Sequence, residues 1–131
     1  MISKSMAVLS AVLLTTMLAG NTVRAEGEYG SLKMSKTAAG DVLTTPEGMT
    51  LYTFDKDKKG VSNCKGDCAK MWPPLKAEKG AKPTGNLTLV KRGDGSMQWA
   101  DEGKPLYTYA KDEKPGDVNG DNVGKVWHVA K

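Results

Sequence analysis

Two cysteines and one histidine are the residues of this chain best suited to chemistry. Cys64 and Cys68 are its only cysteines, and His128 is its only histidine. Two thiolates and one imidazole leave a tetrahedral zinc site one ligand short, and the spacing is not the Cys-x-x-Cys of a redox centre. In an oxidising compartment we favour a disulfide, which would pin one turn and contribute about 2 kcal/mol in the chain-entropy model.

Two aspartates recur at equivalent places and are the next candidates. Asp57 and Asp112 each stand five residues after a tyrosine, Tyr52 and Tyr107. Paired carboxylates can act as general acid and base, but no serine or histidine recurs in register with them. We prefer the alternative that each aspartate accepts hydrogen bonds from the loop that follows it. No catalytic residue is predicted, and we expect a protein that is not an enzyme.

The segment 116–122 resembles the start of a calcium-binding loop. Its first, third and fifth ligand positions would be Asp117, Asn119 and Asp121. An EF-hand then requires Gly at position six and Glu at position twelve, where this chain has Asn and His128. A plain Asx-rich turn is the alternative that we favour. These four residues are the candidate metal ligands.

Methionine thioethers suit Cu(I) and are the last candidates. After residue 25 they are Met34, Met49, Met71 and Met97, which are dispersed and form no Met-x-x-Met run. With a single histidine, this pattern is more typical of packing. A periplasmic protein that handles copper or calcium therefore stays the alternative function, and no cofactor is predicted.

Aromatic residues form the clearest pattern of the chain. Each of two sets holds a Tyr-x-aromatic pair and a later tryptophan: Tyr52, Phe54 and Trp72, then Tyr107, Tyr109 and Trp127. On a strand, residues two apart share one face. In a small domain such rings supply much of the apolar burial, so a core or a seam between two halves is one interpretation. The other is a ring-lined groove for a small ligand or an extended peptide.

The two aromatic sets belong to an internal repeat. When the chain is shifted by 55 residues, 51–57 (LYTFDKD) falls on 106–112 (LYTYAKD), and thirteen of 41 consecutive positions are identical without a gap. Self-similarity at a fixed period indicates tandem copies of one structural unit. We predict two repeats, at about 31–75 and 86–130.

Each repeat has the pattern of a three-stranded antiparallel meander. Runs of strand-forming residues alternate with turns rich in Gly, Pro and Asp. The expected strands are 32–36, 41–45 and 49–55 in the first repeat, and 87–91, 96–100 and 104–110 in the second. The fold class is therefore mainly β, antiparallel, with two pseudo-symmetric tandem meander repeats.

The segment after each meander differs between the repeats. In the first, a short helix near the disulfide is expected at 68–72, with Asp67 as its cap and Pro73 as its stop. In the second, a closing strand is expected at 125–130. The segment 76–85, rich in Lys, Pro and Gly, is expected to link the repeats.

The first 25 residues have the features of a secretory signal peptide. Lys4 gives a positive start, 6–19 is an apolar run, and 23–25 (VRA) places small residues where signal peptidase cleaves. The run is shorter than the roughly 20 residues of a membrane-spanning helix, which is the alternative. We expect 26–131 to be a single domain, periplasmic or secreted, with no membrane anchor after cleavage.

The charge of the chain argues against a nucleic-acid partner. Its formal net charge is +4, and lysines are interleaved with acids, as in 55–59 (DKDKK). A nucleic-acid-binding protein would carry a concentrated basic stripe.

Several motifs, in order along the chain, resemble one bacterial family. The segments 51–57, 62–69 (SNCKGDCA) and 72–75 (WPPL) are typical of the "secreted repeat of unknown function", also described as predicted lipoproteins with a Yx(FWY)xxD motif. The second repeat adds 103–109 (GKPLYTY) and 126–129 (VWHV). The resemblance implies export and a tandem repeat, and it offers no catalytic residue. The lipoprotein label requires a cysteine at the mature start, which this chain lacks.

These features together predict a small exported module that binds a ligand or a protein partner at the cell envelope. The residues expected to form its binding surface are Tyr52, Phe54, Asp57, Trp72, Tyr107, Tyr109, Asp112 and Trp127.

Overall fold

The computed structural model describes residues 29–131, so the expected signal peptide at 1–25 lies outside the described part. Its elements are β1 (Lys33–Thr37), β2 (Gly40–Thr44), β3 (Tyr52–Phe54), α2 (Asp67–Met71), β4 (Lys76–Ala77), β5 (Leu87–Lys91), β6 (Met97–Asp101), β7 (Lys104–Pro105), the 3-10 helix η2 (Val123–Lys125) and β8 (Trp127–Val129). All strand pairs are antiparallel. The expected mainly β fold of two tandem repeats is confirmed.

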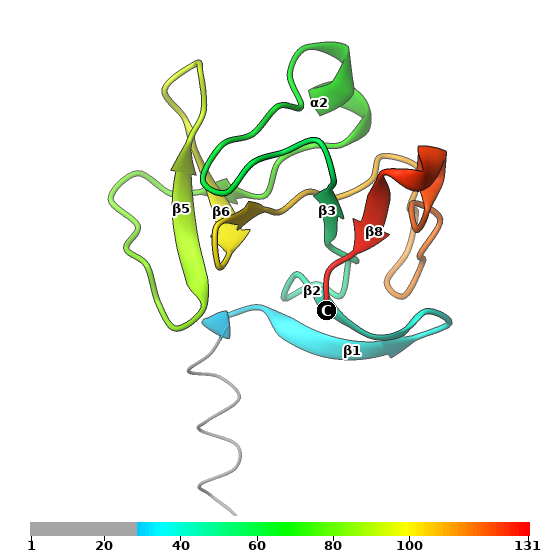
Figure 1. Ribbon diagram of the computed structural model, residues 1–131. Coiled ribbons are helices and arrows are strands. Elements are labelled where there is room, and N and C mark those ends of the chain that lie inside the picture. The colour runs from blue at the N-terminus through cyan, green and yellow to red at the C-terminus, as the bar shows by residue number, and fades with distance from the viewer. Residues whose placement is uncertain (1–28) are drawn as a thin grey trace, which may run out of the picture.

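Two equivalent hairpins begin the two repeats. β1 pairs with β2, and β5 pairs with β6. Gly40 and Gly95, which are 55 residues apart, both take positive φ, at 93° and 89°. This backbone conformation suits glycine in a tight turn. In Figure 1, β5 and β6 lie on the left, β3 and β8 on the right, β1 along the bottom and α2 at the top.

The third strand of the first repeat pairs with the closing strand of the second. β3 is antiparallel to β8, so that Tyr52 lies opposite Val129 and Phe54 opposite Trp127. Within its own repeat, the third strand keeps a bridge from Thr50 to β2. The sequence pattern predicts the strands themselves, but the hydrogen-bonded partner of β3 comes from the other repeat.

The reverse pairing joins the aromatic strand of the second repeat to the end of the first. Thr108 N donates to Pro73 O at 2.9 Å, and Ala110 N donates to Met71 O at 2.8 Å. This pairing is shorter than that of β3 with β8, because Pro73 and Pro74 have no N–H to donate. The two repeats therefore exchange their closing segments.

A pseudo-two-fold axis passes between Tyr52 and Tyr107, which we call the motif tyrosines. Tyr52 N donates to Tyr107 O at 2.8 Å, and Tyr107 N donates to Tyr52 O at 3.0 Å. Such a reciprocal contact between equivalent residues is the mark of an isologous two-fold interface. Here the interface lies within one chain.

The exchange continues beyond the two tryptophans. Leu75 N donates to Leu106 O at 2.9 Å, and Leu75 O accepts a hydrogen bond from Trp99 N at 2.8 Å. The equivalent residue, Ala130, donates from its N to Leu51 O at 2.8 Å. Each repeat thus inserts its last residues into the sheet of the other, and neither repeat completes its hydrogen bonding alone.

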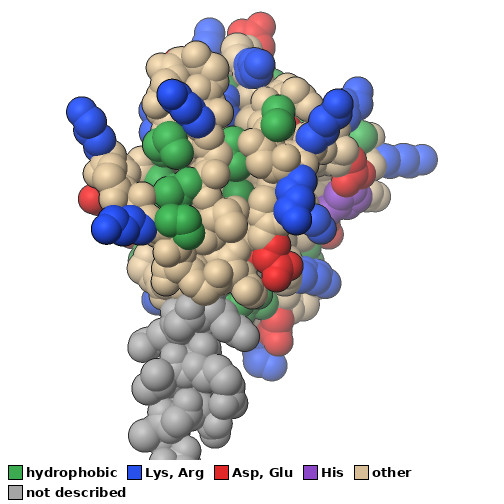
Figure 2. Space-filling model, turned by 60° about the vertical axis from the view of Figure 1, so that its left-hand side comes forward, with side chains coloured by type: hydrophobic (Ala, Val, Ile, Leu, Met, Phe, Trp, Pro, Cys, Tyr) green, Lys and Arg blue, Asp and Glu red, His purple; other side chains and the backbone are tan. Residues whose placement is uncertain are grey.

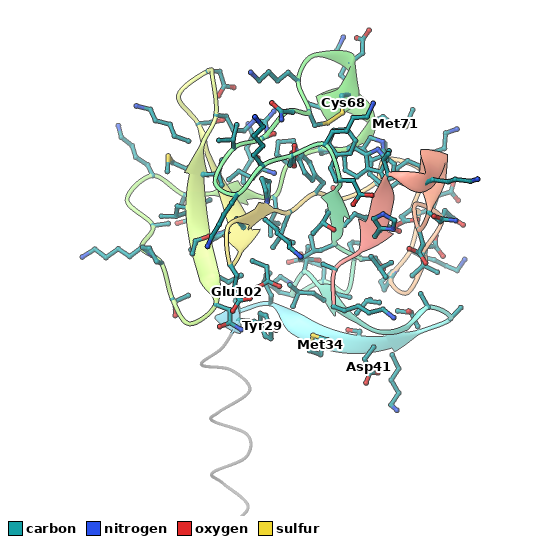
Figure 3. All side chains as sticks on the ribbon, viewed as in Figure 1. Tyr29, Met34, Asp41, Cys68, Met71 and Glu102 are labelled. Atoms are coloured by element: carbon teal, nitrogen blue, oxygen red, sulfur yellow. A yellow bond between two sulfur atoms is a disulfide. The ribbon has the colours of Figure 1, made fainter. Side chains whose placement is uncertain are left out.

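The disulfide between Cys64 and Cys68 is present, as expected. Cys64 is fully buried and belongs to the aromatic core cluster. Figure 3 shows Cys68 and Met71 at the α2 end of the molecule, while Met34 and Asp41 lie at the opposite end, beside β1. The disulfide therefore fixes the loop that leads into α2.

Two local expectations need correction. The N-cap of α2 is Gly66, with φ 61°, and no side chain caps the helix. Asp67 instead forms an exposed ion pair with Lys70 at 3.7 Å. The linker expected at 76–85 starts later than predicted, because β4 pairs with β6.

No helix within 29–131 is long and apolar enough to cross a membrane.

Candidate functional site

Four aromatic rings stack in a row along the seam between the repeats. Phe54 stacks on Trp127 with ring centroids 4.2 Å apart, Trp127 on Trp72 at 3.8 Å, and Trp72 on Tyr109 at 4.0 Å. Phe54 and Trp72 belong to the first repeat, and Trp127 and Tyr109 belong to the second, so the row alternates between the repeats. Stacked rings gain about 0.5–1.5 kcal/mol per pair beyond the burial of their area. The row therefore holds the two halves together.

The two motif tyrosines close the sides of this stack. Tyr52 meets Trp72 edge-on at 5.4 Å, and Tyr107 meets Trp127 edge-on at 5.2 Å. Both tyrosines are fully buried. Trp72, Tyr109 and Trp127 are buried as well, so these five rings lie in the core, which is one of the two interpretations given above. Phe54 is half-buried and lines a surface hollow.

Each motif tyrosine donates a hydrogen bond to the motif aspartate of the other repeat. Tyr52 Oη donates to Asp112 Oδ2 at 2.6 Å, and Tyr107 Oη donates to Asp57 Oδ2 at 2.6 Å. The sequence shows that tyrosine and aspartate recur together, but it does not show that the bonded pairs are crossed. The crossed pairs are therefore part of the interface between the repeats.

The second oxygen of each aspartate accepts from the following loop, as the sequence predicted. Asn63 N donates to Asp57 Oδ1 at 2.6 Å, and Asn119 N donates to Asp112 Oδ1 at 2.9 Å. Each of these asparagines also donates from its side-chain amide to a backbone oxygen before the aspartate. Both carboxyl groups are thus fully engaged in holding loops and tyrosines.

Burial sets the protonation of the two crossed pairs. Desolvation raises the pKa of Asp57 and that of Asp112 above the ordinary value near 3.8, although their hydrogen bonds oppose the rise. Desolvation also raises the pKa of Tyr52 and Tyr107, and the hydrogen bond to each aspartate adds to this rise. At neutral pH the proton therefore stays on the tyrosine oxygen and is not available for acid–base chemistry.

The Asp57–Tyr107 pair extends into a polar network that its counterpart lacks. Ser62 Oγ lies 2.6 Å from Tyr107 Oη. Arg92 Nη1 donates to Ser62 Oγ at 2.9 Å and to Gln98 Oε1 at 2.7 Å. Sequence reasoning missed Arg92, Ser62 and Gln98; the available signal was that Arg92 is the only arginine in 29–131.

The Asp112–Tyr52 pair ends instead on a close-packed backbone. Gly120 N donates to Tyr52 Oη at 3.1 Å. A Cβ at Gly120 would stand 2.8 Å from the Trp72 ring, so only glycine fits this contact. The two equivalent pairs thus have the same centre and different surroundings.

A hollow of about 920 Å³ lies where the two repeats meet at the surface. Its residues come from both repeats: Thr53, Phe54, Asp55, Asp57, Lys58, Lys59, Gly60, Thr88, Leu89, Glu102, Gly103, Lys104 and Pro105. Gly60 N donates to Gly103 O at 2.7 Å and joins the two sides. A Cβ at Gly103 would lie 2.5 Å from Lys59 Cγ, so glycine lets the lysine stem cover this contact.

The candidate calcium ligands do not converge. Asp117 Oδ2 accepts from the backbone N–H groups of Glu113 and Lys114, and Asp121 Oδ1 accepts from Val129 N. The Asn119 amide donates to a backbone oxygen of its own loop.

His128 lies on β8, and its Nε2 is 2.8 Å from Asp55 Oδ2 at the surface. Within the described residues, no group of three or more His, Cys, Asp or Glu side chains is placed to hold a metal ion. The four candidate ligands are thus used for turns, for a contact to β8, and for pairs with Lys114 and Asp55.

The surface carries both signs of charge. Figure 2 shows Lys and Arg side chains spread around one face with Asp and Glu among them, and a small hydrophobic group between them. The charges on this face are mixed, and the view does not show a continuous basic stripe.

Comparison with known proteins gives one result. No curated protein and no solved structure matches the chain. A family model described as "Secreted repeat of unknown function" matches twice, at 33–76 and 88–131. These two matches are themselves 55 residues apart, in the register of the internal repeat. The chain therefore belongs to the family of secreted repeats of unknown function.

Proposed function

We propose that this secreted-repeat protein is a non-enzymatic binding module of the periplasm or cell exterior, and that the hollow between its repeats holds an extended peptide. The supporting observation is the hollow of about 920 Å³, which is lined by both repeats. Ligand sites are typically concave surfaces of this size, with an apolar floor and a few polar groups. The crossed pairs and ring stack would then be the rigid support of the site.

The chemistry of the lining supports a peptide as the ligand. Phe54 and Leu89 give apolar surface, while Lys104 and Glu102 place opposite charges on the rim. An extended peptide presents side chains alternately to two sides, together with backbone donors and acceptors. A surface that offers apolar contacts and both charge signs complements such a ligand.

The same lining argues against catalysis. Asp57 is the motif carboxylate that reaches the hollow, and both of its oxygens already accept hydrogen bonds. The His128–Asp55 pair is exposed, and its hydrogen bond is not to a hydroxyl or thiol nucleophile. A nucleophile paired with a base is what covalent catalysis requires.

The test is a nuclear magnetic resonance titration of labelled protein with pools of extended peptides. We expect the amide resonances of 53–60 and 103–104 to shift in a saturable way. Leu89→Arg should abolish the shifts by filling the hollow, whereas Met34→Arg, on the exposed surface of β1, should leave them intact. Shifts that survive Leu89→Arg in a folded protein would contradict the proposal.

A further inference from the structure

Arg92 holds a charge that the described residues do not neutralise by an ion pair. Its side chain is half-buried, and none of the salt bridges within 29–131 involves it. Three hydrogen bonds fix the guanidinium, and the third runs from Nη2 to Cys64 O at 2.7 Å. An arginine has five N–H donors, so two remain after these bonds are made.

The guanidinium borders a second hollow, of about 310 Å³, beside the larger one. Its side chains include Ser62, Lys65, Lys91 and Arg92, and no acidic residue lines it. Neither lysine takes part in a salt bridge within 29–131. Asp57 and Asp94 interact electrostatically with Arg92 from outside this hollow. Three cations thus surround a concave surface that no carboxylate lines, and such a surface attracts anions.

This cationic hollow is a feature of one side of the molecule only. Under the 55-residue shift, Arg92 is equivalent to Thr37 and Gln98 to Leu43. The residues that orient the guanidinium, Ser62 and Gln98, come from different repeats. The site is therefore built across the seam and has no copy in the other half.

We infer that this hollow binds an oxyanion, either a phosphate or a carboxylate group. The fixed guanidinium supplies two N–H donors, and the ammonium groups of Lys65 and Lys91 supply charge from either side. Arginine is suited to oxyanions because its planar donors match two oxygens at once. The two hollows adjoin at Gly60, which lines both, so a ligand of the larger hollow with an acidic group can reach the site. Oxyanion binding itself does not depend on the proposed peptide function.

The test uses inorganic phosphate and acetate, each compared with chloride at constant ionic strength so that general screening is equal. We expect saturable shifts of the Gly60, Val61 and Gly93 amide resonances with phosphate or acetate. The tighter of the two anions identifies the group that the site selects. Scattered shifts near all surface lysines, or equal shifts with chloride, would overturn the inference.

Matched double variants give the control. Lys65→Gln with Lys91→Gln should weaken binding by about tenfold, since exposed ion contacts each contribute modestly. Lys33→Gln with Lys36→Gln removes the same charge from β1, outside both hollows, and should leave the affinity unchanged. Equal weakening in the two double variants would show a non-specific charge effect and would overturn the inference.

Arg92→Lys keeps the charge and loses the paired donors. We expect it to weaken oxyanion binding while the protein stays folded, as judged by its dispersed amide spectrum. If it binds phosphate and acetate as tightly as the wild type, the guanidinium is not the ligand. Loss of oxyanion binding while peptide shifts persist in the larger hollow would leave the proposed function standing, so the two failures can be told apart.

Discussion

The Asp57–Tyr107 and Asp112–Tyr52 pairs are equivalent by sequence and differ in what surrounds them. Both have an oxygen–oxygen distance of 2.6 Å and join the two repeats. The first pair continues through Ser62 to Arg92 and a cationic hollow. The second ends on the N–H of Gly120, packed against a tryptophan. The repeated part is thus the support, and the unrepeated part is where specific binding is expected.

The largest effect should be common to both repeats. Trp72→Ala and Trp127→Ala each remove a central ring of the stack, and each should lower the free energy of unfolding by about 3–5 kcal/mol. Urea unfolding of both variants measures this. Trp99→Ala is the control, since Trp99 is half-buried outside the stack and should cost less. A large difference between Trp72→Ala and Trp127→Ala would break the equivalence of the halves.

The next effect should separate the two pairs. Tyr52→Phe and Tyr107→Phe each leave one carboxylate oxygen of a motif aspartate without its tyrosine donor, at a cost of about 1–3 kcal/mol. Tyr52→Phe should cost more, because it also strands the N–H of Gly120, whereas Ser62 keeps its bond to Arg92. Denaturant unfolding of both variants gives the order. The reverse order would mean that the Arg92 network, and not the glycine contact, depends more on its tyrosine.

Reduction of the disulfide should affect one loop. The chain-entropy model assigns about 2 kcal/mol to this small ring, so reductant should lower the melting temperature without unfolding the protein. Both loops are also held by an aspartate–asparagine contact, and the loop of the second repeat has this contact without a disulfide. Thermal melting with and without reductant, followed by circular dichroism, measures the effect. Complete unfolding on reduction would show that the loop supports the whole seam.

The smallest effect is the pH dependence of the two pairs. Burial raises the native pKa of Asp57 and Asp112, so in this window the native state binds more protons than the unfolded chain. Their contribution to the free energy of unfolding therefore falls as pH rises from about 3.8 through the raised native pKa. Carbon-detected titration of the carboxyl groups measures both pKa values. Values below 3.8 would reverse the sign and contradict this account.

Sequence reasoning predicted the strands better than their partners. Period-two patterns and the turns at Gly40 and Gly95 fix the hairpins, because these signals are local. The exchange of closing segments is not local. Residues 51–57 and 106–112 are nearly the same, so a closing strand has almost the same complement in either repeat. The sequence alone therefore does not decide which one it joins.

The site was harder to predict for a related reason. The recurrence of tyrosine, aspartate and tryptophan identified the residues of the seam, and their spacing suggested a groove. The stack covers both faces of Trp72 and Trp127, which strand periodicity does not reveal. Arg92 lay outside every motif because it has no counterpart in the first repeat. Its role depends on Gln98, across the β5–β6 hairpin, and on Ser62, which belongs to the other repeat and is adjacent only in the fold.

The most direct test of the crossed seam is a pair of double-mutant cycles on Tyr52. One cycle combines Tyr52→Phe with Asp112→Asn, and the other combines Tyr52→Phe with Asp57→Asn. Residues in one hydrogen bond show coupling of about 0.5–3 kcal/mol, whereas residues without a shared contact add within about 0.5 kcal/mol. The structure predicts coupling with Asp112, in the other repeat, and additivity with Asp57, in the same repeat. Coupling with Asp57 and additivity with Asp112 would contradict the exchange between the repeats.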